Sequence, residues 1–307
     1  MNNVAVLLSS YNGEDFILEL LESLENQTYR NFDLIIRDDG SNDSTREIIS
    51  SFKKRSSIPV IVITDNDKDE VAELSLSSSF FKLVKYANSF QNYKYFLFCD
   101  QDDIWHKNKI EIMVDVISKE ETFRIDEPIL VHSDLNLINE EGDSLNSSFW
   151  EWQNINPLRN STARLLIQNT VTGCATIMNR ELSMKLEDGP NLYYHDHRAA
   201  LIASLNGAVI PISQSLIDYR QHGKNVSGAG GMDVNFIKKT MYIINTFLKI
   251  FFDFEHTKNL INYHYGELNK IIRFGVEEAK QLNELYGNEM NKKSKKSVIN
   301  LSKFFEV

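Results

Sequence analysis

Three short apolar runs near the start of the chain each end in a polar turn. They are residues 4–8, 32–36 and 95–99, and segments with apolar residues at helical spacing separate them. Strands that alternate with helices indicate a parallel sheet with right-handed crossovers. Ligands of open α/β sheets bind outside the carboxyl ends of the strands. The three polar turns therefore predict one shared site at one edge of the sheet.

The same alternation continues to about residue 220, although it loosens after residue 105. Residues 136–160 are expected to form a long, partly irregular loop, and a helix should begin near Ser44, where residues 44–47 fit a capping box. We expect further strands at residues 58–64, 129–132, 171–178, 208–212 and 215–220, and helices at residues 14–26, 80–89, 107–119, 161–168 and 196–206.

Composition excludes several classes of protein. The 307 residues suffice for one large α/β domain or two small ones, and the net charge of −10 argues against a general nucleic-acid-binding protein. Two cysteines, Cys99 and Cys174, give no disulfide framework and suit a reducing cytosol. No apolar run reaches the roughly 18 residues of a spanning helix, and the chain enters a strand at once, without a signal peptide. We therefore expect a cytoplasmic protein.

The charge changes sign along the chain. Residues 1–225 carry a net charge of −13, and residues 226–307 carry +3. Together with the glycine-rich stretch at residues 223–231, this asymmetry predicts a boundary. We expect one domain over residues 1–225 and a helical region over residues 226–307.

The basic tail has two interpretations. Residues 236–252 mix apolar and aromatic residues with lysines, and they are too short and too charged to span a bilayer. They suit an amphipathic helix at a membrane surface, or a helix packed on the body or on a second subunit. Anionic lipids would attract a nearby lysine cluster, whose alternative role is solvated charge, at Lys292, Lys293, Lys295 and Lys296. Residues 232–307 are thus expected to provide either peripheral contact with the inner face of the cell membrane or homo-oligomerisation.

Three carboxylates, Asp100, Asp102 and Asp103, follow the apolar run at residues 95–99. Charges that gather at the end of a buried strand repel one another unless a cation lies among them. Oxygen ligands suit Mg²⁺ or Mn²⁺, which often bridge to substrate phosphates. The pattern therefore indicates a metal-assisted diphosphate site, and its alternative is a solvated acidic turn that caps a helix.

Five stretches in this order resemble family-2 glycosyltransferases of the GT-A type, and among them the bacterial rhamnosyltransferase-like enzymes. They cover about 220 residues, at positions 9–13, 37–44, 98–105, 195–196 and 219–227. The resemblance implies a Rossmann-like α/β fold, with a mostly parallel sheet flanked by helices and a helical C-terminal extension. It also implies a nucleotide-binding half at residues 1–105 and an acceptor-binding, catalytic half at residues 106–225.

The resemblance assigns the nucleotide base to the first two turns. Asp38 or Asp39 would accept a hydrogen bond from the imide N–H of a pyrimidine, and a backbone segment would line the same pocket at Ser9, Tyr11 and Asn12. Asp43 and Ser44 are better explained as helix caps.

The diphosphate and its metal are assigned to the third turn and to the end of the body. The resemblance implies Asp102 as a direct metal ligand and Asp100 as a partner of the ribose or of a metal-bound water. Both side chains can point the same way because residues i and i+2 of an extended strand do so. His222 would be a further metal ligand or a phosphate donor. Arg220 and Lys224 are candidate phosphate contacts, with solvated charge as the alternative.

The resemblance also implies an inverting transferase, which needs a base to take the acceptor hydroxyl proton. Asp196 is the expected base, and its alternative role is a helix N-cap. The expected reaction moves L-rhamnose from dTDP-rhamnose to a glycan or lipid-linked acceptor in bacterial surface polysaccharide synthesis. The alternatives are a UDP-hexose donor or an inactive nucleotide-sugar-binding subunit. A P-loop enzyme is disfavoured because no G-x-x-x-x-G-K-[ST] motif occurs.

Overall fold

The computed structural model describes residues 3–63, 76–187 and 194–223. The chain divides into two compact units, one of residues 1–159 and 169–235, the other of residues 160–168 and 236–307. In the second unit the described residues are 160–168, which contain the predicted helix there, α6 (Thr162–Ile167). The boundary near residue 225 and the helical region that follows it lie outside the described residues and stay predictions.

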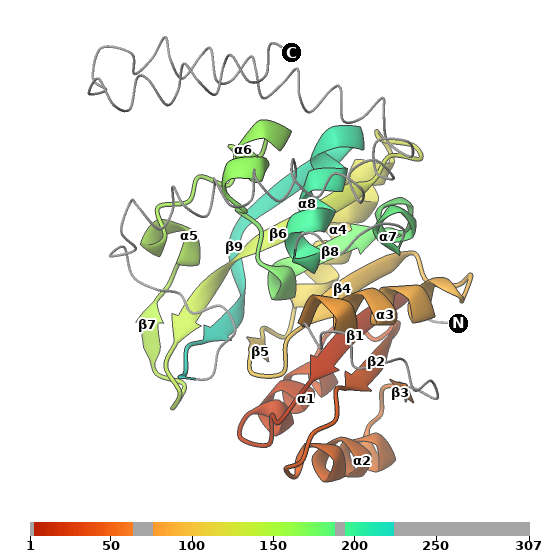
Figure 1. Ribbon diagram of the computed structural model, residues 1–307, viewed down its shortest axis with the longest axis vertical. Coiled ribbons are helices and arrows are strands. Elements are labelled where there is room, and N and C mark those ends of the chain that lie inside the picture. The colour runs from red at the N-terminus through yellow and green to blue at the C-terminus, as the bar shows by residue number, and fades with distance from the viewer. Residues whose placement is uncertain (1–2, 64–75, 188–193, 224–307) are drawn as a thin grey trace, which may run out of the picture. The chain divides into compact units, whose positions relative to one another are not determined.

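The first unit is built on one sheet with the strand order β3-β2-β1-β4-β8-β6-β9-β5 (Figure 1). Its first four strands are parallel: β1 (Val4–Ser10), β2 (Phe32–Asp38), β3 (Val60–Ile63) and β4 (Tyr95–Cys99). β1 pairs with both β2 and β4, so the three polar turns lie side by side, as the sequence predicts.

The second half of the sheet mixes directions. A long parallel ladder joins β6 (Ile129–Ile138) to β9 (Ala208–Arg220), and β8 (Thr176–Asn179) runs antiparallel between β4 and β6. The short strands β5 (Ile104–Trp105) and β7 (Ser144–Asn146) pair antiparallel with β9 and β6. Each antiparallel ladder joins two or three residue pairs, so the sheet is mostly parallel.

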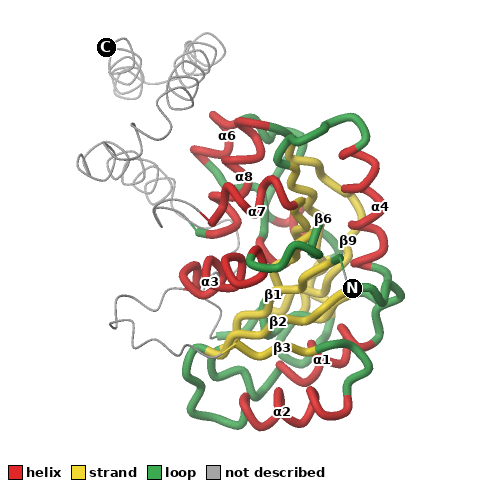
Figure 2. The backbone as a smooth tube through the Cα atoms, turned by 90° about the vertical axis from the view of Figure 1, so that its right-hand side faces the viewer, coloured by secondary structure: helices red, strands yellow, loops and turns green. Residues whose placement is uncertain are grey.

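Helices cover both faces of the sheet (Figure 2). One layer contains α1 (Ile17–Glu25), α2 (Thr45–Arg55) and α4 (Lys109–Glu121), and the other contains α3 (Leu76–Asn88), α7 (Arg180–Glu187) and α8 (His195–Asn206). β1 and β4 are buried along their whole length, which explains why they read as continuous apolar runs. None of the helices in the described ranges is long and apolar enough to cross a membrane.

Three segments differ from the sequence prediction. The expected strand at residues 171–178 is a 3-10 turn, Gly173–Ala175, followed by β8 and then by α7, which the sequence does not predict. The expected loop at 136–160 contains the end of β6, all of β7, and α5 (Phe149–Trp152). The two expected strands within 208–220 form the single strand β9, whose pairing with β6 shifts register between them. Tertiary pairing stabilises these short elements, and local periodicity does not encode it.

The start of α2 corrects the predicted capping box. The Ser44 side chain makes no capping hydrogen bond. The carboxylate of Asp43 accepts hydrogen bonds from the backbone N–H groups of Thr45 at 3.0 Å and Glu14 at 3.1 Å. Asp43 is therefore the capping residue, and it also ties the β1–α1 loop to the start of α2.

Candidate active site

Asp38, at the end of β2, holds its own loop together. Its Oδ2 atom accepts hydrogen bonds from the backbone N–H groups of Gly40 and Ser41, at 3.3 and 3.0 Å, and from Nε of Arg46 at 2.7 Å. Its Oδ1 atom accepts from the hydroxyl groups of Ser10 and Ser41. Burial raises the pKa of Asp38, but these hydrogen bonds outweigh that effect and hold the pKa below its ordinary value. Five donors saturate a carboxylate, which has about four acceptor positions.

Asp39 meets fewer donors than its neighbour. Within the described part of the chain, its carboxylate forms an ion pair with Arg37 and accepts a long hydrogen bond of 3.4 Å from the hydroxyl of Ser9. Arg37 is buried and also donates to Oγ of Ser79 at 2.9 Å. Asp38 and Asp39 are the two candidates for binding the nucleotide base. Asp39 has the greater remaining capacity to accept a hydrogen bond from it.

The β1–α1 loop lies beside Asp39. The Tyr11 side chain is 54% exposed. Asn12 has a φ of +46°, in the left-handed region that asparagine enters more readily than most residues. Its N–H donates to Oγ of Ser41 at 2.9 Å, and its Oδ1 accepts from the N–H of Asn42 at 2.9 Å. The structure thus brings the predicted Ser9, Tyr11 and Asn12 to the same edge as the two aspartates.

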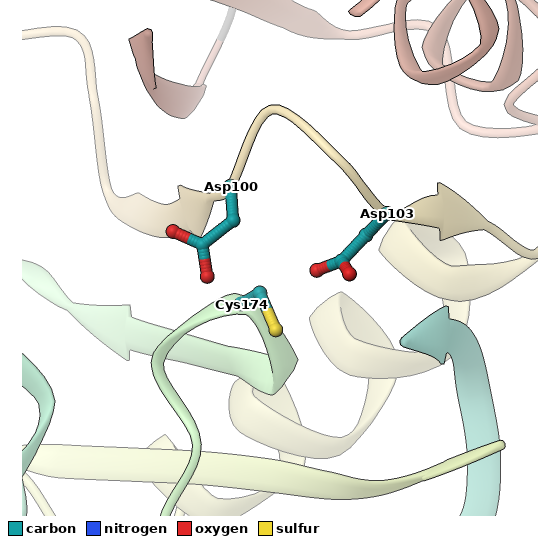
Figure 3. A group of neighbouring side chains, drawn as sticks. All are labelled: Asp100, Asp103 and Cys174. Atoms are coloured by element: carbon teal, nitrogen blue, oxygen red, sulfur yellow. The ribbon is translucent and has the colours of Figure 1, made fainter. Parts of the chain in front are cut away.

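Asp100 and Asp103 converge on Cys174, which lies in the 3-10 turn before β8 (Figure 3). One ligand atom from each of the three residues lies within 4.8 Å of the others. Burial, followed by repulsion from Asp102, raises the pKa of both Asp100 and Asp103. The sequence left open that Asp103 caps the turn before Lys107, but the structure shows a different partner. The Oδ1 atom of Asp103 accepts a hydrogen bond of 3.2 Å from the N–H of Arg220.

Asp102 points to the end of β9. Its Oδ2 atom lies 2.8 Å from Nε2 of His222, and both side chains are largely buried. The ring of Phe16 packs on the imidazole at a centroid distance of 4.8 Å. The structure therefore brings together the two residues that the resemblance assigns to a metal.

Arg220 is engaged with the protein rather than with solvent. Its Nε donates to the carbonyl oxygen of Asp102 at 3.0 Å, and its Nη1 donates to that of Glu140 at 2.7 Å. Its Nη2 forms an ion pair with Glu19, and the guanidinium lies 4.9 Å from the ring centroid of Phe16. Arg220 thus holds the carboxylate turn in place. Lys224, the other predicted phosphate contact, lies outside the described residues.

A fully buried lysine, Lys109, was not predicted from the sequence. Lys109 opens α4, and its Nζ atom donates to the carbonyl oxygen of Cys174 at 2.5 Å and lies 3.3 Å from the ring centroid of Trp105. Burial lowers the pKa of Lys109 to about 8. One signal could have identified it, since Lys109 lies one helical turn before Met113, on the inward face of the helix.

Asp196 lies in the first turn of α8, after the N-cap Tyr194. Its Oδ1 atom accepts a hydrogen bond of 2.6 Å from the N–H of His197. Burial raises the pKa of Asp196 to about 6, against the lowering effect of hydrogen bonds from His197, Gly173 and Asn169. The charge of Asp196 also contributes to the raised pKa of Asp100, after burial and repulsion from Asp102.

His195 fixes the start of α8 against the sheet. Its ring packs between Phe80 and Phe98, at centroid distances of 4.1 and 4.6 Å. Burial lowers its pKa to about 3, which keeps the imidazole neutral. A Cβ atom on Gly173 would lie 2.6 Å from Nε2 of His195 and 3.4 Å from the Asp196 side chain. Only glycine allows the 3-10 turn to approach the His195 ring this closely.

The residues at this edge fit a hard divalent cation. Asp100, Asp102 and Asp103 offer carboxylate oxygens, and the pKa values of Asp100 and Asp103 are raised first by burial and then by repulsion from the neighbouring carboxylates. Carboxylates and an imidazole are ligands that Mg²⁺ and Mn²⁺ accept. Burial raises the pKa of the Cys174 thiol, which therefore stays protonated and is a poor ligand for such ions.

Comparison with curated proteins identifies glycosyltransferase relatives. The chain is 29% identical over 182 residues to an uncharacterized glycosyltransferase of Rickettsia felis, matching 58% of this chain and 27% of that protein. It is 33% identical to the dTDP-rhamnosyl transferase RfbG of Shigella flexneri over 36% of each chain. It is 27% identical to WfgD of Escherichia coli, a UDP-Glc:alpha-D-GlcNAc-diphosphoundecaprenol beta-1,3-glucosyltransferase, over 57% of this chain and 59% of that one. The chain thus spans less than two thirds of the length of each of these relatives.

Solved structures share the fold. S. aureus TarS 1–349 in complex with UDP-GlcNAc superposes with a TM-score of 0.53 at 18% identity, over 80% of this chain and 66% of that one. The mannosyltransferase PcManGT of Pyrobaculum calidifontis, in complex with GDP-Man and Mn²⁺, gives a TM-score of 0.52 at 14% identity, over 73% and 58%. These likenesses confirm the predicted GT-A architecture.

The family itself follows from a match over more than half of the chain. The model of glycosyl transferase family 2 matches residues 5–186, which run from β1 into α7 and include the three polar turns. The chain belongs to glycosyl transferase family 2.

Proposed function

We propose that this chain is an inverting, metal-dependent glycosyltransferase that uses a nucleotide-sugar donor. One observation carries the proposal. Two partly buried carboxylates have raised pKa values, Asp100 at the end of β4 and Asp196 at the start of α8, and the charge of Asp196 contributes to the raised pKa of Asp100 after burial and repulsion from Asp102. Perturbed carboxylates of this kind gather at catalytic sites.

Asp39 and the β1–α1 loop would bind the nucleotide base. Asp39 can accept the imide N–H of uracil or thymine, and cytosine lacks that donor. Asp38 keeps the loop in shape, because its oxygens are already saturated by protein donors. The exposed ring of Tyr11 offers an apolar surface beside this position.

Asp102 and His222 would hold a divalent cation, and Asp100 would bind the ribose or a metal-bound water. When bound, Mg²⁺ or Mn²⁺ stabilises the negative charge that develops on the leaving nucleoside diphosphate. Arg220 orients the turn that carries Asp102, through its hydrogen bond to the Asp102 carbonyl. Its role in this proposal is positioning, in place of the direct phosphate contact that the resemblance implied.

Asp196 would act as the general base. Its carboxylate takes the proton of an acceptor hydroxyl while that oxygen bonds to the anomeric carbon of the donor sugar. The bond between the anomeric carbon and the diphosphate oxygen breaks on the opposite face, so the configuration inverts. A pKa near 6 suits this task, because the group is ionised at neutral pH and remains a moderately strong base.

The donor and the acceptor follow from resemblance. We propose L-rhamnose from dTDP-rhamnose as the donor, with a UDP-hexose as the alternative, since RfbG is named for the first and WfgD for the second. The acceptor would be a glycan or a lipid-linked saccharide in bacterial surface polysaccharide synthesis.

A donor-hydrolysis screen tests the proposal. The full chain is incubated with dTDP-rhamnose and with UDP-hexoses, in Mg²⁺, in Mn²⁺ or in EDTA, and nucleoside diphosphate release is measured. Metal-dependent release from one donor supports the enzyme. Nucleotide binding without release from any donor, with a saccharide acceptor present, would support the inactive binding subunit.

A further inference from the structure

The side chain of Gln101 forms two hydrogen bonds with the backbone of a single residue in another loop. Its Oε1 accepts from the N–H of Tyr11 at 2.8 Å, and its Nε2 donates to the carbonyl oxygen of Tyr11 at 3.0 Å. These two bonds reproduce the reciprocal pattern of a hydrogen-bonded residue pair in an antiparallel ladder. One amide thus joins the turn after β4 to the loop after β1, across 90 residues of sequence.

The space for this contact is provided by a glycine. A Cβ atom on Gly13 would lie 2.3 Å from Oε1 and 2.6 Å from Cδ of Gln101. Any other residue at position 13 would displace the Gln101 amide. Gly13 is itself held in place, since its N–H donates to Oγ1 of Thr45 at 2.8 Å.

The two residues of this contact, Gln101 and Tyr11, belong to different parts of the proposed donor site. Gln101 lies between Asp100 and Asp102, in the turn that would bind the metal and the diphosphate. Tyr11 lies in the loop that would line the base pocket, and that loop is held from its other side by Ser41 and Asn42 through Asn12. The contact therefore spans the two places that one nucleoside diphosphate would occupy.

We infer that Gln101 is a positioning residue that couples metal binding to nucleotide binding, by holding the β1–α1 loop at a fixed separation from the carboxylate turn. This inference rests on the proposed function. Two contact regions on the protein give a nucleoside diphosphate the highest binding affinity when they are already held at the right separation before it binds. Without the Gln101 contact, the base loop and the carboxylate turn would each still bind their own part of the ligand. The binding free energies of the two contact regions would then no longer add fully.

The test measures the affinity of UDP and of dTDP for the full chain by calorimetry, once with Mn²⁺ and once with EDTA. The ratio of the two dissociation constants is the metal–nucleotide coupling. In Gln101→Met, which keeps the length but loses both hydrogen bonds, we expect this ratio to fall about ten-fold, the size of one to two net hydrogen bonds. We expect the affinity in EDTA to change by less than about three-fold.

Gly13→Ala supplies an independent way to break the same contact. It should lower the ratio to a similar extent, and the double variant Gly13→Ala/Gln101→Met should be no worse than either single variant. Asn26→Ala is the matched control, because Asn26, the C-cap residue of α1, also donates from its side-chain amide to a backbone carbonyl, that of Glu22, away from the donor site. Hydrogen exchange at the N–H of Tyr11 should become faster in Gln101→Met and stay unchanged in Asn26→Ala.

The outcomes are separable. An unchanged ratio in Gln101→Met, or an equal loss of affinity with Mn²⁺ and with EDTA, would overturn the coupling role. Additive losses in the double variant would also overturn it, because they would show two unrelated effects. Failure of the unmodified chain to bind either nucleotide would instead reject the proposed function, and the coupling inference with it.

Discussion

Nε2 of His222 lies 2.8 Å from Oδ2 of Asp102, although 120 residues separate them in the sequence. The short strand β5 makes this contact possible. Ile104 pairs with Asp218 and Trp105 with Ile217, so the chain that follows the carboxylate turn runs antiparallel to the end of β9. A ladder of two residue pairs thus brings the C-terminal end of the body to the proposed metal site.

We expect Asp102→Ala to abolish metal-dependent donor turnover while the fold stays intact. The reason is that Asp102 and His222 form the pair of candidate ligands that the structure places in direct contact. Turnover and circular dichroism are the measurements, with Asp115→Ala as a control that removes an exposed carboxylate from α4. Full activity of Asp102→Ala in the presence of a chelator would contradict this role.

Asp196→Asn should keep donor binding and lose transfer by about 10²- to 10⁴-fold, because an amide cannot accept the proton. The observation behind this expectation is a partly buried carboxylate that accepts hydrogen bonds from Gly173 and His197 at the start of α8. Steady-state kinetics and nucleotide affinity should be measured together. Near-normal turnover would reduce Asp196 to a structural role at the helix start.

The pH dependence of transfer should follow the raised pKa of Asp196. The carboxylate is the active form of a base, so its protonation removes activity. With a pKa of about 6, activity should be retained above this pH and should fall about ten-fold per pH unit below it. The measurement is kcat/KM against pH at saturating Mn²⁺. A profile that stays flat down to about pH 4.5, near the ordinary range of a carboxyl group, would rule out this assignment.

Arg220→Met should destabilise the fold by on the order of 3 kcal/mol, because it removes a buried guanidinium that donates to two partly buried carbonyl groups and pairs with Glu19. Those carbonyls belong to Asp102 and Glu140. Urea denaturation measures the change in the free energy of unfolding. Arg55→Met is the control, since its pairing with Glu22 is exposed and its loss should cost less than about 0.5 kcal/mol. Equal effects of the two variants would argue against a clamping role.

The effect of salt distinguishes the two interpretations of the basic tail. If residues 232–307 bind a membrane, liposomes with anionic lipid should co-sediment with the full chain at low ionic strength and less so at high ionic strength. A variant with glutamine replacing Lys292, Lys293, Lys295 and Lys296 should bind more weakly. A packed interface with a second subunit would barely respond to salt. Absence of lipid binding in a chain that is dimeric by light scattering would leave oligomerisation as the role of the tail.

Much of the site was accessible from the sequence because strand ends are encoded locally. The apolar runs that become β1, β2 and β4 each end where the structure ends them, within two residues. Parallel pairing then gathers their polar turns, so the sequence alone assigns Ser9, Asp39 and Asp100 to one edge of the sheet. The position of Asp196 came from resemblance, and the helix start that carries it was also predicted.

Other features were decided by the tertiary structure alone. The sequence could not separate Asp38 from Asp39, because the difference lies in donors that other loops supply, such as Ser10 and Arg46. The resemblance implied Arg220 as a phosphate contact, but the hydrogen bonds of its guanidinium to the carbonyl oxygens of Asp102 and Glu140 depend on where β9 ends.

The sequence by itself determined the alternation of strands and helices and the chemistry of the turns, because periodicity and composition act over a few residues. The tertiary structure decided which of those groups meet. Lys109 is buried beside Cys174, and Gln101 bonds to Tyr11, only because β4, β8 and β1 lie in one sheet. Contacts between residues that are 65 and 90 positions apart depend on the packing of the whole sheet, which the sequence pattern over a few residues does not specify.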